Sequence, residues 1–355
     1  MTEKATERGP DRSLTAPARI PINVLFGVPD DNRASARVTP DGKRVDFTLP
    51  GTANMVAYLS KRFALNPLHL QQGGPLPRAI APGAFLNHIA DADICSRALE
   101  LAKQVAQDVA RPCFNHPIEV AGTTRDGVAQ ALAGIPGLTV PKTIRIKTTT
   151  PSAFRQIVDQ EGLAYPILVR VPGFHGGLKI IRIDKKEAIE DIAKLRSGGE
   201  SLYATEFRDF VSPDGRYRKF RVVVVGDEIH LRTCIIGDNW LLGRGYRAPD
   251  SEKEERDQLE TFDRNLAPHL KPVFEEIARR LGVDYFGVDC NIDKNGQVLL
   301  FEANACMNIL RNNFPPPNIW DAPIKRISAA VEQLLASPEK WRQYWRSANA
   351  SATLQ

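Results

Sequence analysis

A strand, a tight turn and a second strand in the C-terminal part of the chain constrain its fold more than any other feature. Phe286 to Ile292 is an apolar run, Asp293-Lys294-Asn295-Gly296 is a turn sequence, and Val298 to Glu302 is a second, mainly apolar run. An Asn-Gly pair between two such runs predicts a β-hairpin. Because the turn is tight, the carboxylates of Asp289 and Glu302 can point to one face of two neighbouring strands.

Three oxygen-bearing side chains gather on this hairpin. Asn304 follows Glu302 by two positions on one strand, so the two side chains share a face, which Asp289 can join from the other strand. Two carboxylates and an amide oxygen suit Mg²⁺ or Mn²⁺, which also takes ligands from substrate phosphates. The alternative is a solvated strand face, which fits less well because Glu302 and Asn304 interrupt an apolar strand.

A second candidate site is a glycine-rich loop between two predicted strands. Ile167 to Arg170 delivers Arg170 to the start of the segment Val171-Pro172-Gly173-Phe174-His175-Gly176-Gly177, and a further strand spans Lys179 to Ile183. Bare backbone N–H groups in such a loop can close over an anion such as a triphosphate. A Rossmann turn or a Walker loop would open a helix, so neither is present here. The alternative is a simple turn with a solvated His175.

The third cluster is cationic. Glu206-Phe207-Arg208 precedes Arg218-Lys219-Phe220-Arg221, and these cations lie beside predicted strands, where they suit phosphate or carboxylate recognition. A charged sheet edge that resists aggregation is the alternative, which we prefer for Arg208 and Arg218. Arg221 opens an apolar strand and is the better ligand candidate.

The rest of the sequence predicts alternating strands and helices. The chain of 355 residues is long enough for two or three domains. The rhythm of strand, helix and strand over residues 84–89, 96–109 and 112–115 predicts a parallel sheet. Further expected elements are a strand at 22–26, a hairpin of 36–38 and 45–47 around a turn at 39–42, helices at 53–65, 127–132, 153–161, 258–281, 322–335 and 340–347, and strands at 203–210, 220–225 and 229–236.

Composition excludes several classes of protein. The net charge of +5 is too weak to indicate a nucleic-acid partner. The five cysteines are scattered and never spaced as CxxC, which argues against a disulfide framework and a structural zinc site and favours a reducing, cytoplasmic compartment. Residues 1–19 lack the apolar core of a signal peptide, and no stretch approaches the roughly 18 apolar residues of a membrane span.

The order of these motifs resembles that of the ATP-grasp superfamily, and in detail its glutathione synthetase and ribosomal-protein glutamate ligase branch. The resemblance runs from about Asn115 to Asn304. It implies a phosphate-binding role for Arg170, a mobile phosphate cover at Gly173 to Gly177 with His175 at its tip, and adenine contacts from the strand of Glu206 and Phe207. It also implies that Arg221 matches an arginine of the glutamate ligases and that Asp289, Glu302 and Asn304 are magnesium ligands.

The sequence departs from the family pattern at three places. The upstream lysine that contacts the α-phosphate is missing, and Arg125 is the expected substitute. Lys219 stands where many members carry an acidic residue that contacts ribose. Asn304 is followed by Ala-Cys-Met-Asn where Ser-Pro-Gly is usual nearby.

The fold implied by the resemblance is α/β, with an ATP-grasp fold behind an N-terminal pre-ATP-grasp domain. We expect a flexible tail at 1–19, the N-terminal domain at 20–117, a central lobe at 118–199 and a C-terminal lobe with the metal at 200–347. Asp91 and Asp93 either line the cleft from the N-terminal domain or stand at a helix N-terminus, where the helix dipole favours acidic residues.

The implied function is an ATP- and magnesium-dependent ligase that joins a carboxylate to an amine through an acylphosphate and releases ADP and phosphate. Arg170 and Arg221 would neutralise the transferring phosphoryl group. The substrates would be small molecules or peptides, with no nucleic-acid or membrane partner. A small-molecule kinase of the same superfamily and a non-catalytic ATP-binding module are the alternatives.

Overall fold

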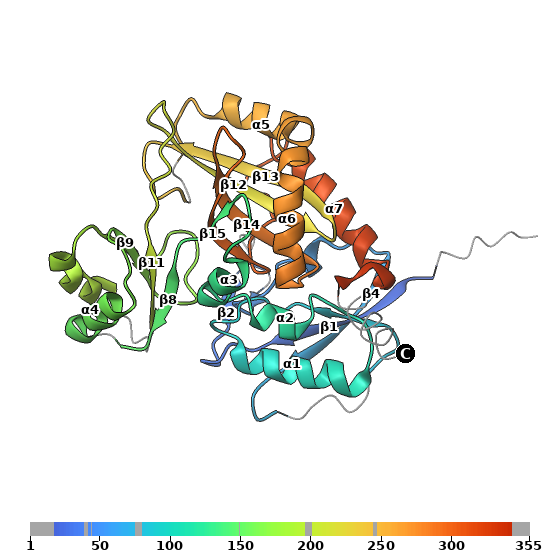
Figure 1. Cartoon of the computed structure of the whole chain (residues 1–355). Coiled ribbons are helices and arrows are strands. Elements are labelled where there is room, and N and C mark those ends of the chain that lie inside the picture. Colours follow the sequence, from blue (N-terminus) through green and yellow to red (C-terminus); the bar gives the residue numbers. More distant parts are fainter. Residues whose placement is uncertain are drawn as a thin grey trace, which may run out of the picture.

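The computed structural model describes residues 18–38, 42–43, 45–74, 80–148, 150–195, 201–243 and 247–342. These residues form an α/β protein of three lobes, each built around its own sheet (Figure 1). The predicted tail at 1–19 and the end of the predicted C-terminal helix at 340–347 lie largely outside the described residues.

The N-terminal lobe contains the predicted parallel sheet. Its strands run in the order β4-β1-β5-β6, and their bounds are Ile20–Gly27 for β1, Phe63–Leu70 for β4, Ala84–Asn87 for β5 and Cys113–Phe114 for β6. Helix α1 (Ser96–Val109) buries Ala98, Leu99, Ala102, Val105 and Ala106. Small and branched apolar side chains at three- and four-residue spacing therefore pack this helix onto the sheet.

The structure corrects one predicted helix in this lobe. Residues 53–65 form a short 3₁₀ turn, η1 (Val56–Tyr58), and then enter β4. The backbone N–H groups of Met55 and Val56 donate to Nε2 of the buried His88, and β4 pairs in parallel with β1. Long-range pairing therefore outweighs the local helical pattern. The predicted hairpin is confirmed as β2 (Ser35–Val38) and β3 (Val45–Thr48), although residues 39–41 of its turn lie outside the described residues.

The central lobe is an antiparallel sheet covered by helices. Its strands run in the order β10-β9-β11-β8, with bounds Thr143–Ile146 for β8, Ile167–Arg170 for β9, Ile180–Ile183 for β10 and Leu202–Glu206 for β11. Helix α4 (Pro151–Gln160) and the 3₁₀ segment η2 (Lys186–Leu195) supply Phe154, Val158 and Ile189 to a hydrophobic core that belongs to this lobe alone.

The C-terminal lobe carries the predicted hairpin in a sheet of order β13-β12-β14-β15-β7. Its strands are β7 (Leu138–Thr139), β12 (Tyr217–Val225), β13 (Glu228–Gly237), β14 (Tyr285–Ile292) and β15 (Val298–Asn304). Its helices are α3 (Arg125–Leu132), α5 (Glu252–Asn265), α6 (Ala267–Leu281), α7 (Asp321–Leu335) and η3 (Pro338–Lys340). Helix α2 (Pro117–Ala121) packs instead on α1 of the N-terminal lobe. Every residue of β14 is buried, as expected for a strand with neighbours on both sides.

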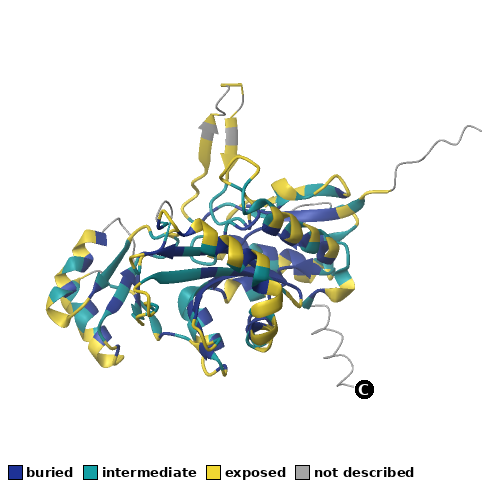
Figure 2. Ribbon diagram, turned by 90° about the horizontal axis from the view of Figure 1, so that it is seen from above, coloured by how far each residue is buried: buried dark blue, intermediate teal, exposed yellow. Residues whose placement is uncertain are grey.

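The lobe boundaries differ from those expected. Strand β11 completes the central sheet, so the chain leaves the central lobe after Glu206 and not at residue 199. Strand β7 pairs with β15 and α3 packs on α6, which places residues 125–139 with the C-terminal lobe. The N-terminal and C-terminal lobes share one hydrophobic core, and Figure 2 shows the buried residues gathered in their interior. The hydrophobic core of the central lobe is therefore separate from the core that the other two lobes share.

Candidate active site

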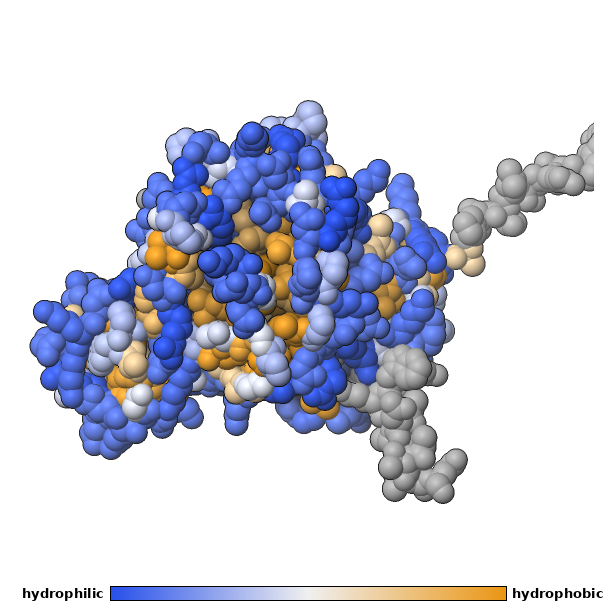
Figure 3. All heavy atoms as spheres, turned by 45° about the horizontal axis from the view of Figure 1, so that its top comes forward, coloured by the Kyte–Doolittle hydropathy of each residue, from blue (hydrophilic) through white to orange (hydrophobic). Residues whose placement is uncertain are grey.

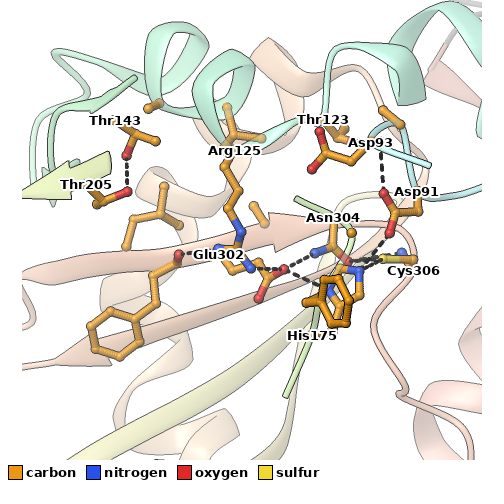
Figure 4. A pocket seen from close by; sticks show the side chains of 18 of the residues that line it. Asp91, Asp93, Thr123, Arg125, Thr143, His175, Thr205, Glu302, Asn304 and Cys306 are labelled. Carbon is orange, nitrogen blue, oxygen red and sulfur yellow. Dashed lines mark hydrogen bonds and ion pairs between the residues drawn. The ribbon is translucent and has the colours of Figure 1, made fainter. Parts of the chain in front are cut away.

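The three oxygen-bearing residues of the hairpin come together as predicted. Asp289 on β14 stands opposite Glu302 on β15, and Asn304 follows on the same strand. The Nδ2 of Asn304 donates to Oε1 of Glu302 at 2.8 Å (Figure 4). Asp289 and Asn304 are buried, with 4% and 6% of their surface exposed. Two carboxylates and an amide oxygen thus converge in a largely dehydrated place, which fits a hard divalent cation.

Cations neutralise both carboxylates. Arg221 donates to Asp289 through Nε at 2.7 Å and Nη2 at 2.8 Å, and the Nζ of Lys219 lies 3.5 Å from the same carboxylate. Burial alone would raise the pKa of Asp289, but Arg221 and Lys219 lower it. Arg125 lies 2.5 Å from Glu302, and it helps to hold the pKa of Glu302 well below its usual range against the effect of burial. Both carboxylates are therefore ionised near neutral pH.

Arg170 adds a further positive charge at the end of β9. Burial, together with the neighbouring Arg125, lowers its pKa to about 10, and its Nε has no hydrogen-bond partner among the described residues. With Lys219 and Arg221, four cations surround two carboxylates. Such an excess of positive charge, with an unpartnered guanidinium nitrogen, suits an anionic ligand such as a polyphosphate.

The glycine-rich loop reaches the same place through His175. The Nδ1 of His175 lies 3.3 Å from Oε1 of Glu302, and its Nε2 lies 2.7 Å from Oδ2 of Asp91 (Figure 4). Burial would lower the pKa of His175, but hydrogen bonds with Asp91, Cys306 and Glu302 raise it. The imidazolium form therefore ties the loop to the N-terminal and C-terminal lobes.

The glycines of this loop have conformations that favour glycine. Gly173, Gly176 and Gly177 have φ angles of 73°, 68° and 80°. A Cβ atom at Gly173 would also lie 2.3 Å from Cγ2 of Ile94 in the N-terminal lobe. The backbone of the loop thus approaches the neighbouring lobe more closely than a side chain would allow.

Below the loop is a small cavity of about 50 Å³ between the three lobes. Of the predicted site residues, its lining includes Arg125, Gly173, His175, Glu302 and Asn304. The lining does not include Arg170, Gly176, Gly177, Glu206, Phe207, Lys219, Arg221 or Asp289. Small-molecule sites usually enclose about 300–1,000 Å³, so a nucleotide would enter only if the loop or the central lobe moved.

Glu206 and Phe207 lie where the central and C-terminal lobes join. The Oε1 of Glu206 accepts a hydrogen bond from the backbone N–H of Ala164 at 3.2 Å. The guanidinium of Arg182 lies 4.2 Å from the centre of the Phe207 ring, and Trp240 meets that ring edge-on at 5.6 Å. Arg182 thus covers one face of the Phe207 ring, and Trp240 packs against its edge.

Arg208 and Arg218 belong to charged edges, in agreement with the interpretation that we preferred. Arg208 is exposed and donates to Glu206 at 2.7 Å. Arg218 is held between Asp214 and Glu254. Their guanidinium groups are therefore engaged in ion pairs away from the cavity lining.

A network of residues around Arg145 escaped the sequence analysis. The Nη2 of Arg145 on β8 lies 2.6 Å from Oδ1 of Asp93 and 3.2 Å from Oδ1 of Asp126. The same oxygen of Asp93 also accepts a hydrogen bond from the hydroxyl of Tyr203 at 2.6 Å. Asp91 and Asp93 line the cavity, whereas α1 begins at Ser96 and has no acidic residue in its first turn. The cleft interpretation of the two aspartates is therefore right and the helix N-terminus interpretation is wrong. Arg145 and Tyr203 belong to no motif, so only the packing of the lobes reveals them.

No protein-family model and no curated protein matches the sequence. Solved structures do match the fold. A D-alanine-D-alanine ligase from Coxiella burnetii has a TM-score of 0.56 at 10% identity, covering 95% of this chain and 100% of the other. The VanG D-Ala:D-Ser ligase from Enterococcus faecalis has a TM-score of 0.52 at 13% identity, covering 92% and 100%. Both are ATP-grasp ligases. The chain has the ATP-grasp fold.

A D-alanine-D-alanine ligase from Bacillus anthracis also matches the fold, with a TM-score of 0.51 at 11% identity over 93% of this chain and 99% of the other. The ATP-grasp fold accounts for the three lobes and for the position of the site between them. The branch of glutathione synthetase and the ribosomal-protein glutamate ligases stays a prediction.

Hydrophilic residues cover most of the face in Figure 3, with apolar residues visible between them. Within the described ranges, every helix is too short or too polar to cross a bilayer.

Proposed function

We propose that this protein is an ATP-dependent ligase that joins a carboxylate to an amine through an acylphosphate and releases ADP and phosphate. The observation that carries the proposal is the meeting of Arg125, Arg170 and Arg221 with Asp289 and Glu302 where the central lobe meets the C-terminal lobe. Two anions, a polyphosphate and a carboxylate, must be brought together in this chemistry, and a site with excess positive charge lowers the cost of doing so.

Asp289, Glu302 and Asn304 would hold Mg²⁺ or Mn²⁺. Such an ion, when bound, neutralises charge on the phosphates of the nucleotide. The chain's own contribution is orientation. Arg221 fixes Asp289 through two hydrogen bonds, and the amide of Asn304 fixes Glu302, so both carboxylates would be held in place when the ion binds.

The cations bind and position the phosphates. The unpartnered Nε of Arg170 and the guanidinium of Arg125 would pair with phosphate oxygens, and Arg221 would add charge next to the transferring group. Phe207 and Trp240 would hold the adenine, with Glu206 beside them. Lys219 reaches Asp289 and the carbonyl of Leu242, so we assign it to the phosphate end and not to the ribose.

The reaction proceeds in two steps. A carboxylate oxygen of the first substrate attacks the γ-phosphorus, the bond to the bridging oxygen of ADP breaks, and an acylphosphate forms. The amine nitrogen of the second substrate then attacks the acyl carbon, phosphate leaves, and the amine loses a proton. Water would hydrolyse the acylphosphate, so the glycine-rich loop and His175 would act by closing the site.

The likeness to ligases supports ligation over phosphorylation of a hydroxyl group. Three solved structures with TM-scores above 0.5 are named as D-alanine-D-alanine or D-Ala:D-Ser ligases. Amino acids and short peptides are therefore the first substrates to test, in pools that are scored for ATP consumption.

Hydroxylamine trapping tests the proposal. The enzyme, Mg²⁺-ATP and an active pool are quenched with acidic hydroxylamine, and the nucleotide product is separated by chromatography. A hydroxamate together with ADP is the expected result. A stable phosphate ester would support the kinase alternative, AMP would contradict the proposed reaction, and ATP binding with no turnover on any pool would support a binding module.

A further inference from the structure

A second group of metal-type ligands lies beside the proposed magnesium site. Oδ2 of Asp91, Nε2 of His175 and Sγ of Cys306 all lie within 4.8 Å of one another (Figure 4). Asp91 comes from the N-terminal lobe, His175 from the glycine-rich loop of the central lobe, and Cys306 from the segment after β15. Three parts of the chain that are far apart in sequence therefore present one ligand atom each to a common point.

The donor set differs in kind from that of Asp289, Glu302 and Asn304. A thiolate and an imidazole favour Zn²⁺, whereas Mg²⁺ favours oxygen ligands alone. Zinc bonds of about 2.0–2.3 Å in a tetrahedron place neighbouring ligand atoms roughly 3.3–3.7 Å apart. The observed separations are 2.7 Å from Nε2 of His175 to Oδ2 of Asp91 and 3.7 Å from Nε2 to Sγ of Cys306. Small side-chain rotations are enough to admit the ion.

The surroundings of His175 also suit a metal-binding imidazole, because Zn²⁺ on binding would displace the Nε2 proton of the imidazolium into solvent. Its Nε2 faces the other two ligands, and its Nδ1 lies 3.3 Å from the carboxylate of Glu302. A histidine that binds zinc through one nitrogen usually donates the other N–H to a carboxylate, which fixes the ring and strengthens the ligand. Asn304 Oδ1 lies 3.2 Å from Sγ of Cys306, so an amide oxygen or a water molecule is at hand for the fourth position.

We propose that Asp91, His175 and Cys306 form a zinc site that fastens the glycine-rich loop to the other two lobes. The loop carries His175, so bound Zn²⁺ holds the loop against the cavity that it covers. If the proposed function is right, nucleotide entry requires this loop to open, and Zn²⁺ then acts as an inhibitor that competes with ATP. The metal site itself does not depend on that function.

Titration with Co²⁺ alone, in the absence of nucleotide, tests the site in the full-length protein. A cobalt–thiolate bond absorbs in the near ultraviolet, and tetrahedral Co²⁺ gives strong visible bands. We expect one equivalent of Co²⁺ to produce both signals and one equivalent of Zn²⁺ to remove them. No thiolate band at one equivalent would overturn the proposal.

Matched variants identify the ligands. Cys306→Ser should abolish the thiolate band and weaken Zn²⁺ binding by more than about 100-fold, since second-shell changes alone cost 10–100-fold. Cys95→Ala is the control, because Cys95 is a second thiol close to Asp91, whose backbone carbonyl accepts the N–H of Cys95. A band that survives Cys306→Ser but not Cys95→Ala would contradict the assignment.

The remaining ligands and the loop complete the test. His175→Ala and Asp91→Asn should each weaken Zn²⁺ binding by a similar factor, and Glu302→Gln by about 10-fold through the imidazole. Thermal unfolding checks that each variant is folded. If Cys306→Ser is not folded, Cys306→Ala replaces it. Hydrogen exchange of residues 173–177 should slow when Zn²⁺ alone is added. Unchanged exchange with Zn²⁺ bound would overturn the fastening role.

The outcomes separate this proposal from the proposed function. Zinc binding without any ligase activity would leave the metal site standing and the ligase proposal refuted. ATP turnover in a protein that binds no Zn²⁺ would do the reverse.

Discussion

The guanidinium of Arg125 lies 2.5 Å from the carboxylate of Glu302, which joins the first residue of α3 to strand β15. Thr124 caps the helix by accepting a hydrogen bond from the N–H of Gly127 at 3.2 Å, so the start of α3 is fixed in place. A cation is thereby held next to a proposed metal ligand, although the sequence has no lysine at the position that the ATP-grasp family uses. This geometry supports Arg125 as the substitute and makes it testable.

Arg125→Ala should weaken the binding of Mg²⁺-ATP by roughly 10- to 100-fold, the range of a hydrogen bond to a charged group. Arg125→Lys should recover part of the lost affinity, because lysine keeps the charge but cannot form bidentate hydrogen bonds. Isothermal titration calorimetry measures both. Arg256→Ala, which removes an exposed arginine paired with Glu252 on α5, is the control and should bind as the parent does. Equal affinity in all variants would exclude Arg125 from the nucleotide site.

Glu302→Gln should keep the fold and lose metal-dependent turnover. The two side chains have the same shape, but glutamine lacks the charge that balances a divalent ion. We expect at least about a 100-fold fall in ADP release with either Mg²⁺ or Mn²⁺ and little change in the circular dichroism spectrum. Glu260→Gln, at an exposed position of α5, serves as the matched control. A fully active Glu302→Gln enzyme would mean that the ligands are wrong.

Elements with strong local patterns could be predicted from the sequence, and contacts between lobes could not. Helix α1 spans Ser96–Val109 and β9 spans Ile167–Arg170, the same bounds that periodicity predicts, because each buries a face that its own sequence defines. The hairpin of Asp289 and Glu302 follows from its Asn-Gly turn. The meeting of Asp91 with His175 depends instead on how two lobes pack, and neither residue carries a local signal of it.

A buried carboxyl group between the N-terminal and C-terminal lobes predicts a pH-dependent stability. Oδ2 of Asp284 accepts the N–H of Asn115 at 2.8 Å, and Oδ1 accepts that of Arg342 at 2.6 Å. Burial raises the pKa of Asp284 to about 6, although both hydrogen bonds oppose the change. The folded state therefore holds the proton more tightly than the unfolded state, whose aspartate has a pKa of about 3.9.

The contribution of Asp284 to stability should accordingly be complete below about pH 4 and decline as the pH rises through about 6. The decline amounts to roughly 3 kcal/mol in the free energy of unfolding. The asparagine of Asp284→Asn mimics the neutral acid, so this variant should not show the decline in stability. Urea unfolding of both proteins from pH 4 to 7 gives the difference, which should move in favour of the variant as the pH increases. A constant difference would mean that Asp284 titrates normally.

The glycine-rich loop should close on the nucleotide, and Gly176 tests this best. Gly176 has a φ of 68° and open space around its Cα, so Gly176→Val causes no clash in the present structure but forces a β-branched residue into the left-handed region. The strain, about 1–2 kcal/mol, and the added bulk both oppose close approach of the loop backbone to phosphate oxygens. Mg²⁺-ATP binding should weaken about 10-fold or more in calorimetry.

Gly215→Val is the matched control for this change. Gly215 has a φ of 81° and equally open surroundings, but it lies in the turn between β11 and β12 and not in the glycine-rich loop. The control should lose stability to a similar degree and keep its affinity for the nucleotide. In the parent protein, hydrogen exchange at residues 173–177 should slow when Mg²⁺ and a non-hydrolysable ATP analogue are added, because loop N–H groups then bond to phosphate. If exchange there is unchanged while the analogue binds, the loop is a hairpin turn and the phosphate cover must be sought elsewhere.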